Sequence, residues 1–101
     1  MHARMSTLEG SPEEMDVGLR DVRERVLPLL NQQEGFKGFI ALGNRQSGEL
    51  IGITFWESEQ AMQASEEVGS RTRSDTAEAT GDAIEDVERY EVGLFEMSSQ
   101  L

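Results

Sequence analysis

The sequence contains no cysteine and a single histidine, His2. The lack of cysteine excludes a disulfide framework, a thiolate nucleophile and a zinc–cysteine site, and one histidine cannot build a histidine-rich metal site within one chain. We therefore predict no metal site and no cofactor. His2 lies at the start of the chain, where a general base is hard to hold in place, so we expect it to be a surface residue.

Basic residues are also scarce, with nine Lys and Arg against twenty Asp and Glu, and the formal net charge is -11. Such a surface repels phosphate backbones and anionic lipid headgroups, so we predict no nucleic-acid partner and no membrane partner. No apolar run reaches the ~18 residues that a membrane span needs. The first ten residues, MHARMSTLEG, lack the apolar region of a secretory signal, which favours a cytoplasmic protein.

The 101 residues predict one domain, residues 1–101, with one modest core. Strand-like stretches cover residues 2–9, 36–44 and 48–57, and a fourth lies within 82–97, most clearly at 87–95. Helical patterns begin at Ser11 and at Ser58, the second of them covering 58–81. The order β-α-β-β-α-β predicts an α+β, ferredoxin-like protomer, with a four-stranded antiparallel sheet and two helices on one face.

Local signals support these boundaries. Ser11, Pro12 and Glu14 form the pattern of a capping box at the start of the first helix. Gly35 suits the left-handed residue that ends that helix, and Gly48 suits the hairpin loop between the second and third strands. The apolar stripe of the first helix recurs every three or four residues at Met15, Leu19, Val22, Val26 and Leu29 or Leu30.

Pro28 interrupts this helix, because its ring crowds the carbonyl of Glu24 and it has no N–H to donate, at a cost of about 3 kcal/mol in a regular helix. The resulting kink serves either core packing or the opening of a pocket mouth. The second helix has a thin inner stripe of small residues, Ala61, Ala64 or Ser65, Val68, Thr72 and Ala79, and Gly69 is its expected weak point. A thin stripe indicates either a close approach to the sheet or a void beneath the helix.

The central strands are apolar on both faces, because side chains alternate along a strand. On the third strand Ile51, Ile53 and Phe55 share one face, and Leu50, Thr54 and Trp56 share the other. Two helices cover only one face, and the other would leave an apolar patch of several hundred Å², which is large for a monomer. We therefore predict a homodimer through whichever face the helices leave uncovered.

Four stretches together resemble one family: GSPEEMD (10–16), EGFKGFIAL (34–42), GITFWESEQAMQASEE (52–67) and VERYEV (87–92). They are similar to the antibiotic-biosynthesis-monooxygenase-like group of the dimeric α+β barrel superfamily. The resemblance implies two sheets that close into a dimeric barrel, and a cavity between helices and sheet in each protomer. It also implies that the face bearing Ile51, Ile53 and Phe55 is the one that pairs in the homodimer. It also implies, for an enzyme of this group, cofactor-independent oxygenation of an aromatic, polyketide-like substrate in an apolar pocket.

The match to family site residues is partial. Trp56 matches the tryptophan that family enzymes place at the end of the third strand. Gly52 stands four residues before it, on the strand where family oxygenases commonly carry a pocket asparagine. The iron-ligating histidine that haem-degrading members carry on the second helix has no counterpart in residues 58–81. No catalytic residue is therefore assigned.

The candidate pocket-lining residues are Trp56, Thr54, Thr7, Met62, Val68 and Tyr90. Trp56 is either a core anchor or part of the pocket wall, and the Tyr90 hydroxyl is a candidate donor to a substrate carbonyl. The predicted function is that of a small-molecule-binding homodimer resembling cofactor-independent monooxygenases. The alternatives are a non-catalytic ligand-sensing or accessory dimer module, and a structural partner without a ligand.

Overall fold

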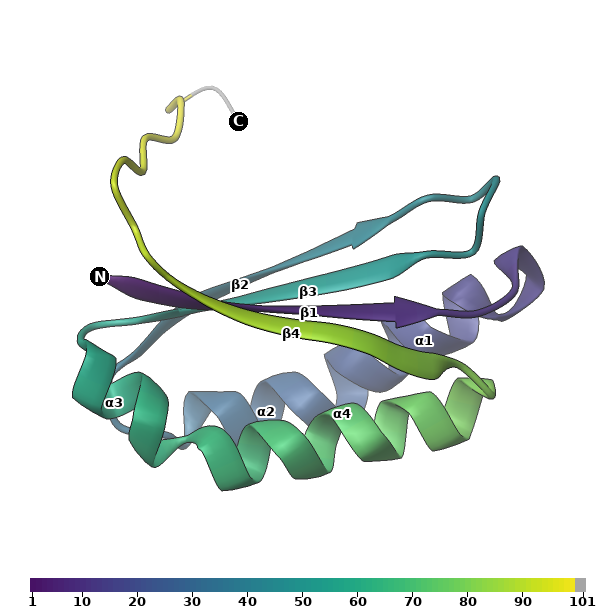
Figure 1. Ribbon diagram of the computed structural model, residues 1–101, viewed down its shortest axis with the longest axis horizontal. Coiled ribbons are helices and arrows are strands. Elements are labelled where there is room, and N and C mark those ends of the chain that lie inside the picture. Colours follow the sequence, from purple (N-terminus) through teal and green to yellow (C-terminus); the bar gives the residue numbers. More distant parts are fainter. Residues whose placement is uncertain (100–101) are drawn as a thin grey trace.

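The computed structural model describes residues 1–99 and forms one antiparallel sheet covered on one face by helices (Figure 1). The chain order is β1 (His2–Glu9), a 3-10 turn (Pro12–Glu14), α1 (Met15–Asp21), a π-helical segment (Val22–Val26), α2 (Leu27–Asn31), β2 (Phe36–Gly43), β3 (Leu50–Trp56), α3 (Glu59–Ala64), α4 (Glu66–Thr80) and β4 (Ala83–Glu91). The strands lie in the order β2-β3-β1-β4. This confirms the predicted ferredoxin-like protomer.

The first helical region departs from its predicted start. Ser11 has an extended backbone, and its side chain makes no capping hydrogen bond, so the predicted capping box does not form. With Pro12 at the first helical position, the chain instead enters a 3-10 turn in which the amide of Glu14 donates to the carbonyl of Ser11 at 3.1 Å. A capping box would need Glu14 in the first turn of an α-helix, but Glu14 lies in this tighter 3-10 turn.

Pro28 follows a change in helical winding. The π-helical segment ends where the amide of Leu27 donates to the carbonyl of Val22, five residues earlier. This wider turn comes directly before the proline, whose missing N–H would have bonded Glu24 in a regular α-helix. Beyond it Leu30 is fully buried, which resolves the choice between Leu29 and Leu30 for the core.

The second helical region is two helices rather than one, and they meet at Ser65 instead of weakening at Gly69. The predicted cap is confirmed, because the Ser58 hydroxyl oxygen accepts a hydrogen bond from the amide of Ala61 at 3.1 Å. The buried stripe of α4 is Gly69, Thr72, Thr76, Ala77 and Thr80. Val68 and Ala79, which were predicted to face inward, are not among these buried residues. The buried stripe is small and hydroxyl-bearing because β1 presents the polar side chains of Arg4 and Ser6 beneath it.

Both turn glycines are left-handed, with φ of +82° at Gly35 and +85° at Gly48. Gly35, however, does not end the first helix: α2 ends at Asn31 with Gln32 as its right-handed cap, and Gly35 lies in the turn that leads into β2. The last strand ends at Glu91, earlier than the predicted Phe95, because its partner β1 ends there: Glu91 pairs with His2. Beyond it the chain turns over the sheet face that the helices do not cover, and Phe95 packs edge-to-face on Phe55 with ring centroids 5.3 Å apart (Figure 1).

The register assigns the two faces of the sheet. Thr54 pairs with Arg4 and Trp56 with His2, so these side chains share the face under the helices. The core on that face is formed by Val26, Leu30, Trp56 and Met62. We call the other side the open face. It carries Ala3, Met5, Thr7, Ile40, Leu42, Ile51, Ile53, Phe55 and Tyr90. No helix within residues 1–99 is long and apolar enough to cross a membrane.

Candidate binding site between the sheet and α4

A cavity of about 60 Å³ lies between the sheet and the helices that cover it. This volume exceeds what one water molecule requires. Its walls are mostly apolar and come from every layer of the protomer: Leu8, Val22, Val26, Leu30, Phe39, Ala41, Leu50, Ile51, Gly52 and Gly69. The polar lining comes from β1, β3 and α4: Arg4, Ser6, Thr54, Thr72, Arg73 and Thr76. An apolar cavity with a few convergent polar groups is the usual form of a small-molecule site.

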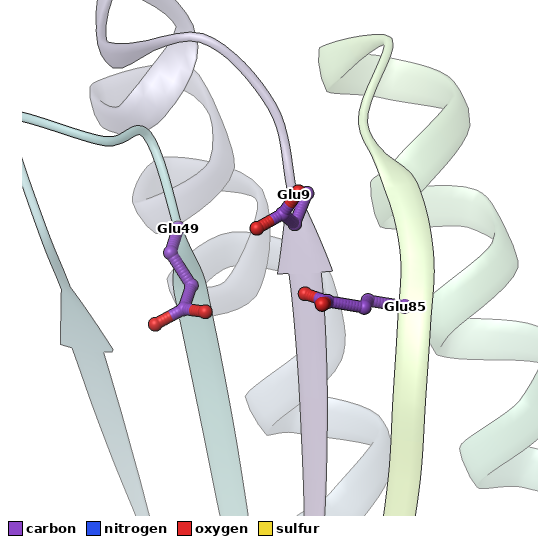
Figure 2. A group of neighbouring side chains, drawn as sticks. All are labelled: Glu9, Glu49 and Glu85. Carbon is purple, nitrogen blue, oxygen red and sulfur yellow. The ribbon is translucent and has the colours of Figure 1, made fainter.

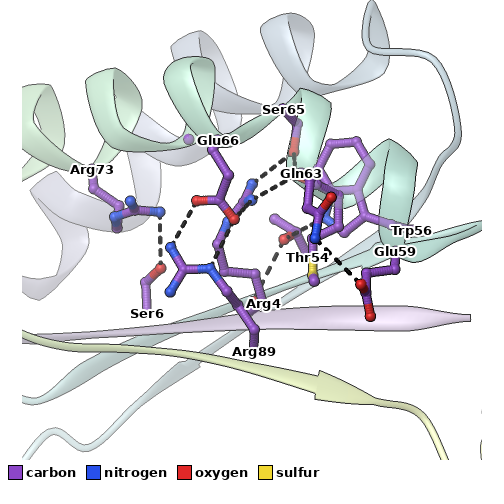
Figure 3. Close-up of polar contacts among 12 residues, drawn as sticks. Arg4, Ser6, Thr54, Trp56, Glu59, Gln63, Ser65, Glu66, Arg73 and Arg89 are labelled. Carbon is purple, nitrogen blue, oxygen red and sulfur yellow. Dashed lines mark hydrogen bonds and ion pairs between the residues drawn. The ribbon is translucent and has the colours of Figure 1, made fainter.

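Arg4 is the most buried charged residue of the site, with 2% of its surface exposed. Its guanidinium donates to the carbonyl of Met62 at 3.2 Å, to the Ser65 hydroxyl at 3.0 Å and to the carboxylate of Glu66 at 3.0 Å (Figure 3). It also lies 5.5 Å from the ring centre of Trp56. Burial lowers the pKa of Arg4, and the attraction of Glu66 opposes that shift.

Glu66 is shared between two arginines. Besides Arg4, it accepts two hydrogen bonds from Arg89, at 2.8 and 2.7 Å, in a bidentate pair (Figure 3). The hydrogen bonds from Arg89, helped by the charge of Arg4 and opposed by burial, lower the pKa of Glu66 to about 2. Glu66 is therefore ionised at neutral pH and neutralises one of the two cations.

Arg73 is the third arginine of the cluster, and it has no carboxylate partner within residues 1–99. Its Nη1 lies 3.5 Å from the hydroxyl oxygen of Ser6 (Figure 3). Burial lowers the pKa of Arg73, and the charge of Arg4 lowers it further. We call Arg4, Arg73, Arg89 and Glu66 the arginine cluster. Its three cations and one anion give a net charge of +2 in a protein of net charge -11.

Gly69 allows α4 to approach the sheet over Arg4. A Cβ atom at this position would lie 2.7 Å from Nη2 of Arg4, closer than real Cβ contacts allow. The guanidinium cannot easily move aside, because Ser65 and Glu66 both hold it. Gly69, the predicted weak point of the helix, is thus a position where the helix approaches the sheet closely. The thin stripe of small residues therefore has both predicted causes: a close approach at Gly69 and a cavity beside it.

The predicted pocket residues fall into three groups. Thr54 lines the cavity and accepts a hydrogen bond from Nε1 of Trp56 at 2.8 Å. Trp56 itself is 0% exposed and belongs with Met62 to the adjoining core, and Val68 does not line the cavity. Two other predicted residues need correction, because strand alternation places them on the open face: Thr7 pairs with Ile51, and Tyr90 pairs with Ala3.

The sequence reasoning missed the arginine cluster. Arg4 alternates with apolar residues in β1, a pattern typical of a solvent-facing side chain. The one local signal was the run of small residues on the second helix, because Ser65, Gly69 and Thr72 follow at spacings of four and three. Such a stripe indicates a close neighbour but does not say that the neighbour is an arginine.

A second cluster of charge lies on the open face. The carboxylates of Glu9 in β1, Glu85 in β4 and Glu49, the residue before β3, lie within 4.8 Å of one another (Figure 2). The negative charge of Glu9 is the main cause that raises the pKa of Glu85. Exposed acidic groups of this kind are expected on a small, strongly acidic surface, and the cluster alone does not define a metal site.

No family model matches this chain. Two proteins of Mycobacterium tuberculosis strain H37Rv, both described as uncharacterised, are related in sequence. Rv2557 is 36% identical over 91% of this chain and 41% of its own length. Rv2558 is 40% identical over 66% of this chain and 28% of its own length. The chain thus spans less than half the length of these relatives.

Solved structures show the fold. A monooxygenase from the gene ActVA-Orf6 of Streptomyces coelicolor, in complex with nanaomycin D, has a TM-score of 0.70 at 13% identity, covering 96% of this chain and 92% of its own. SnoaB, a cofactor-independent oxygenase from Streptomyces nogalater, has a TM-score of 0.62 at 13% identity, covering 93% and 92%.

A dimeric ferredoxin-like protein from an uncultured marine organism has a TM-score of 0.68 at 12% identity, covering 96% of this chain and 98% of its own. The predicted resemblance is confirmed at the level of the fold: the chain has the ferredoxin-like α+β fold of the antibiotic biosynthesis monooxygenase-like proteins.

Proposed function

We propose that this protein binds a small apolar or aromatic molecule in the cavity between the sheet and α4, and oxygenates it without a cofactor. The observation that carries the proposal is the cavity itself, which joins an apolar wall to cationic and hydroxyl groups. The structural likeness to a cofactor-independent oxygenase supports the reaction class by analogy of fold.

In this reaction the protein has two roles, which are to bind the substrate and to stabilise its anion. An activated CH₂ group that is conjugated to an aromatic ring and a carbonyl group loses a proton to solvent water, because no lining side chain can accept it. The resulting carbanion supplies the electrons that reduce O₂. One oxygen atom remains as a new carbonyl and the other leaves as water, so CH₂ and O₂ become C=O and H₂O without an external reductant. The site would favour the substrate anion, because Arg73 and the Ser6 hydroxyl stand in a partly dehydrated wall.

Oxygen uptake tests this reaction. With 1,8-dihydroxyanthrone as substrate, we expect uptake faster than the uncatalysed rate. Ala41 lines the cavity from the edge strand β2 and is exposed, so Ala41→Trp should fill the space and remove the excess rate without opening the core. Gln46→Trp, which adds the same side chain in the exposed hairpin loop, should leave the rate unchanged. Uptake at the uncatalysed rate with wild-type protein would remove the enzymatic proposal for this substrate class.

A non-catalytic ligand-sensing module is the second candidate, and a specific observation favours it. The described lining residues include no histidine or carboxylate that could accept a proton, and no asparagine or glutamine that could bind a substrate carbonyl. Ligand binding that Ala41→Trp abolishes, without oxygen uptake in the wild type, would favour this module over the enzyme.

We also propose a homodimer joined through the open face. Ile51, Ile53 and Phe55 lie on that face, and Leu42 and Tyr90 beside them are about half exposed. The C-terminal segment covers only the end around Phe55, and Leu94 within it is 85% exposed. Each large apolar side chain left in water forgoes about 1.5–3 kcal/mol, which favours pairing with a second copy. A structural neighbour described as dimeric supports the same arrangement.

Sedimentation at low micromolar concentration tests the dimer. We expect wild-type protein to sediment as a dimer and Ile53→Glu to sediment as a monomer, because the substitution buries a charge at the centre of the proposed interface. Val17→Glu is the matched control, since Val17 is an exposed apolar residue of α1 on the other side of the molecule. A wild-type monomer would contradict the proposal, as would an Ile53→Glu dimer as tight as the wild type.

A further inference from the structure

We infer that the ligand of the cavity carries a carboxylate, and that Arg73 is the residue that pairs with it. This inference rests on the proposed function only in that the cavity must bind a small molecule. It names the chemical class of that molecule: an organic acid with one anionic group and an apolar, ring-sized body.

The first step is that two of the three arginines are already occupied. Arg4 donates to Met62, Ser65 and Glu66, so its guanidinium is held inside the protomer. Arg89 is engaged by the same Glu66 carboxylate in a bidentate pair. Arg89 does not line the cavity, and Arg4 could turn to a ligand only by giving up its contacts with Ser65 and Glu66.

The second step is that Arg73 is charged, half-buried and, within residues 1–99, without a carboxylate at ion-pair distance. It lines the cavity and makes one long hydrogen bond, 3.5 Å, to the neutral hydroxyl of Ser6. A partly buried cation gains most from an anion that approaches from the same side, because water screens that pair poorly. The net charge of +2 in the cluster falls to +1 when one carboxylate binds.

The third step concerns the remaining donors. Thr72 donates to the carbonyl of Gly69 at 3.0 Å, and Thr76 donates to Asp21 at 2.7 Å, so both hydroxyl hydrogens are used within the protein. Ser6 only accepts, from Arg73, and its own hydrogen is free to donate. Arg73 and Ser6 thus form a paired donor site on the cavity wall, which matches the two oxygens of a carboxylate.

The fourth step concerns the rest of the ligand. The cavity walls beyond Arg73 are apolar and include Val26, Leu30, Phe39 and Leu50. They suit an aromatic or branched hydrocarbon body. The strong negative charge of the whole protein repels anions elsewhere on its surface. An anionic ligand is therefore favoured only near the arginines of the cavity.

The experiment compares 1-naphthoate with its neutral primary amide, 1-naphthamide, by titration calorimetry on the wild-type protein. We expect the carboxylate to bind about tenfold tighter or more than the amide, as a charge-assisted contact provides. Arg73→Gln should remove that preference while changing amide binding less than about threefold. Arg73→Lys, which keeps the charge, should retain most of the preference.

Arg71→Gln is the matched control, because Arg71 lies on the same helix, faces solvent and pairs with Glu67. It removes the same charge from α4 and should change neither affinity. Equal binding of the two compounds to wild-type protein, or equal loss of both in Arg73→Gln, would overturn the carboxylate inference and leave the small-molecule cavity standing. Failure of both compounds to bind would count against the cavity as a binding site and so against the proposed function and this inference together.

Discussion

Replacing Trp56 with alanine should lower the free energy of unfolding by about 3–5 kcal/mol, the range for removing a large aromatic side chain from a core. Trp56 is 0% exposed and packs in the cluster of Val26, Leu30 and Met62. It also makes an edge-to-face contact with Phe36, with ring centroids 5.4 Å apart. The substitution therefore removes packing contacts of the sheet with the first helical region and with α3 at the same time.

The measurement is chemical denaturation followed by far-ultraviolet circular dichroism, at one fixed protein concentration because a dimer gains stability with concentration. Trp56→Phe is the control. It keeps an aromatic ring but loses the Nε1 hydrogen bond to Thr54, so it should cost clearly less than Trp56→Ala. A loss below about 1 kcal/mol for the alanine variant would show that Trp56 is not the anchor of this core.

Replacing Glu66 with glutamine should destabilise the protein by about 2–4 kcal/mol at neutral pH. The substitution leaves Arg4 buried without its counter-ion, and removing one partner of a buried pair is strongly destabilising. We place the effect below that of a fully buried pair because the Glu66 side chain is 31% exposed and water screens part of the interaction. Glu67→Gln is the matched control, since Glu67 is exposed and pairs with Arg71 at 3.6 Å, and should cost less than about 0.5 kcal/mol.

The same pair predicts a pH dependence. The pKa of Glu66 is lowered to about 2 in the folded protein, so its carboxylate contributes stability that is fully present above the ordinary glutamate pKa of 4.5. That contribution is lost as the pH falls from about 4.5 to about 2. The difference in unfolding free energy between wild-type protein and Glu66→Gln should therefore shrink across this window. A difference that stays constant from pH 6 to pH 2.5 would contradict the assignment.

The cluster around Glu66 also explains the composition of α4. A helix that packs over a buried arginine must offer acceptors and leave room, which Ser65 and Gly69 do. Two further contacts tie α4 to the first helical region: Arg25 pairs with Asp75 at 3.3 Å, and Thr76 donates to the Asp21 carboxylate at 2.7 Å. These contacts hold α4 in place beside the cavity.

Local patterns in the sequence determined the order of strands and helices, the cap at Ser58 and the left-handed turns at Gly35 and Gly48. These features depend on near neighbours along the chain, through side-chain alternation, backbone freedom and hydrogen bonds within a turn. Even so, the start of the first helix was wrong, because Pro12 favoured a 3-10 turn over the capping box that Ser11 and Glu14 suggested.

Only the tertiary structure decided the site. Arg4 and Glu66 are 62 residues apart, and Glu66 and Arg89 are 23 apart. No local pattern can show that a strand arginine faces inward, since the polar half of an alternating strand normally faces water. The fold brings Arg4 and Arg89 of the sheet close to Arg73 and Glu66 of α4, so that three arginines share one carboxylate. Long-range packing pairs Glu66 with Arg4 and Arg89, and Arg73 is left as the cation for which we propose a ligand.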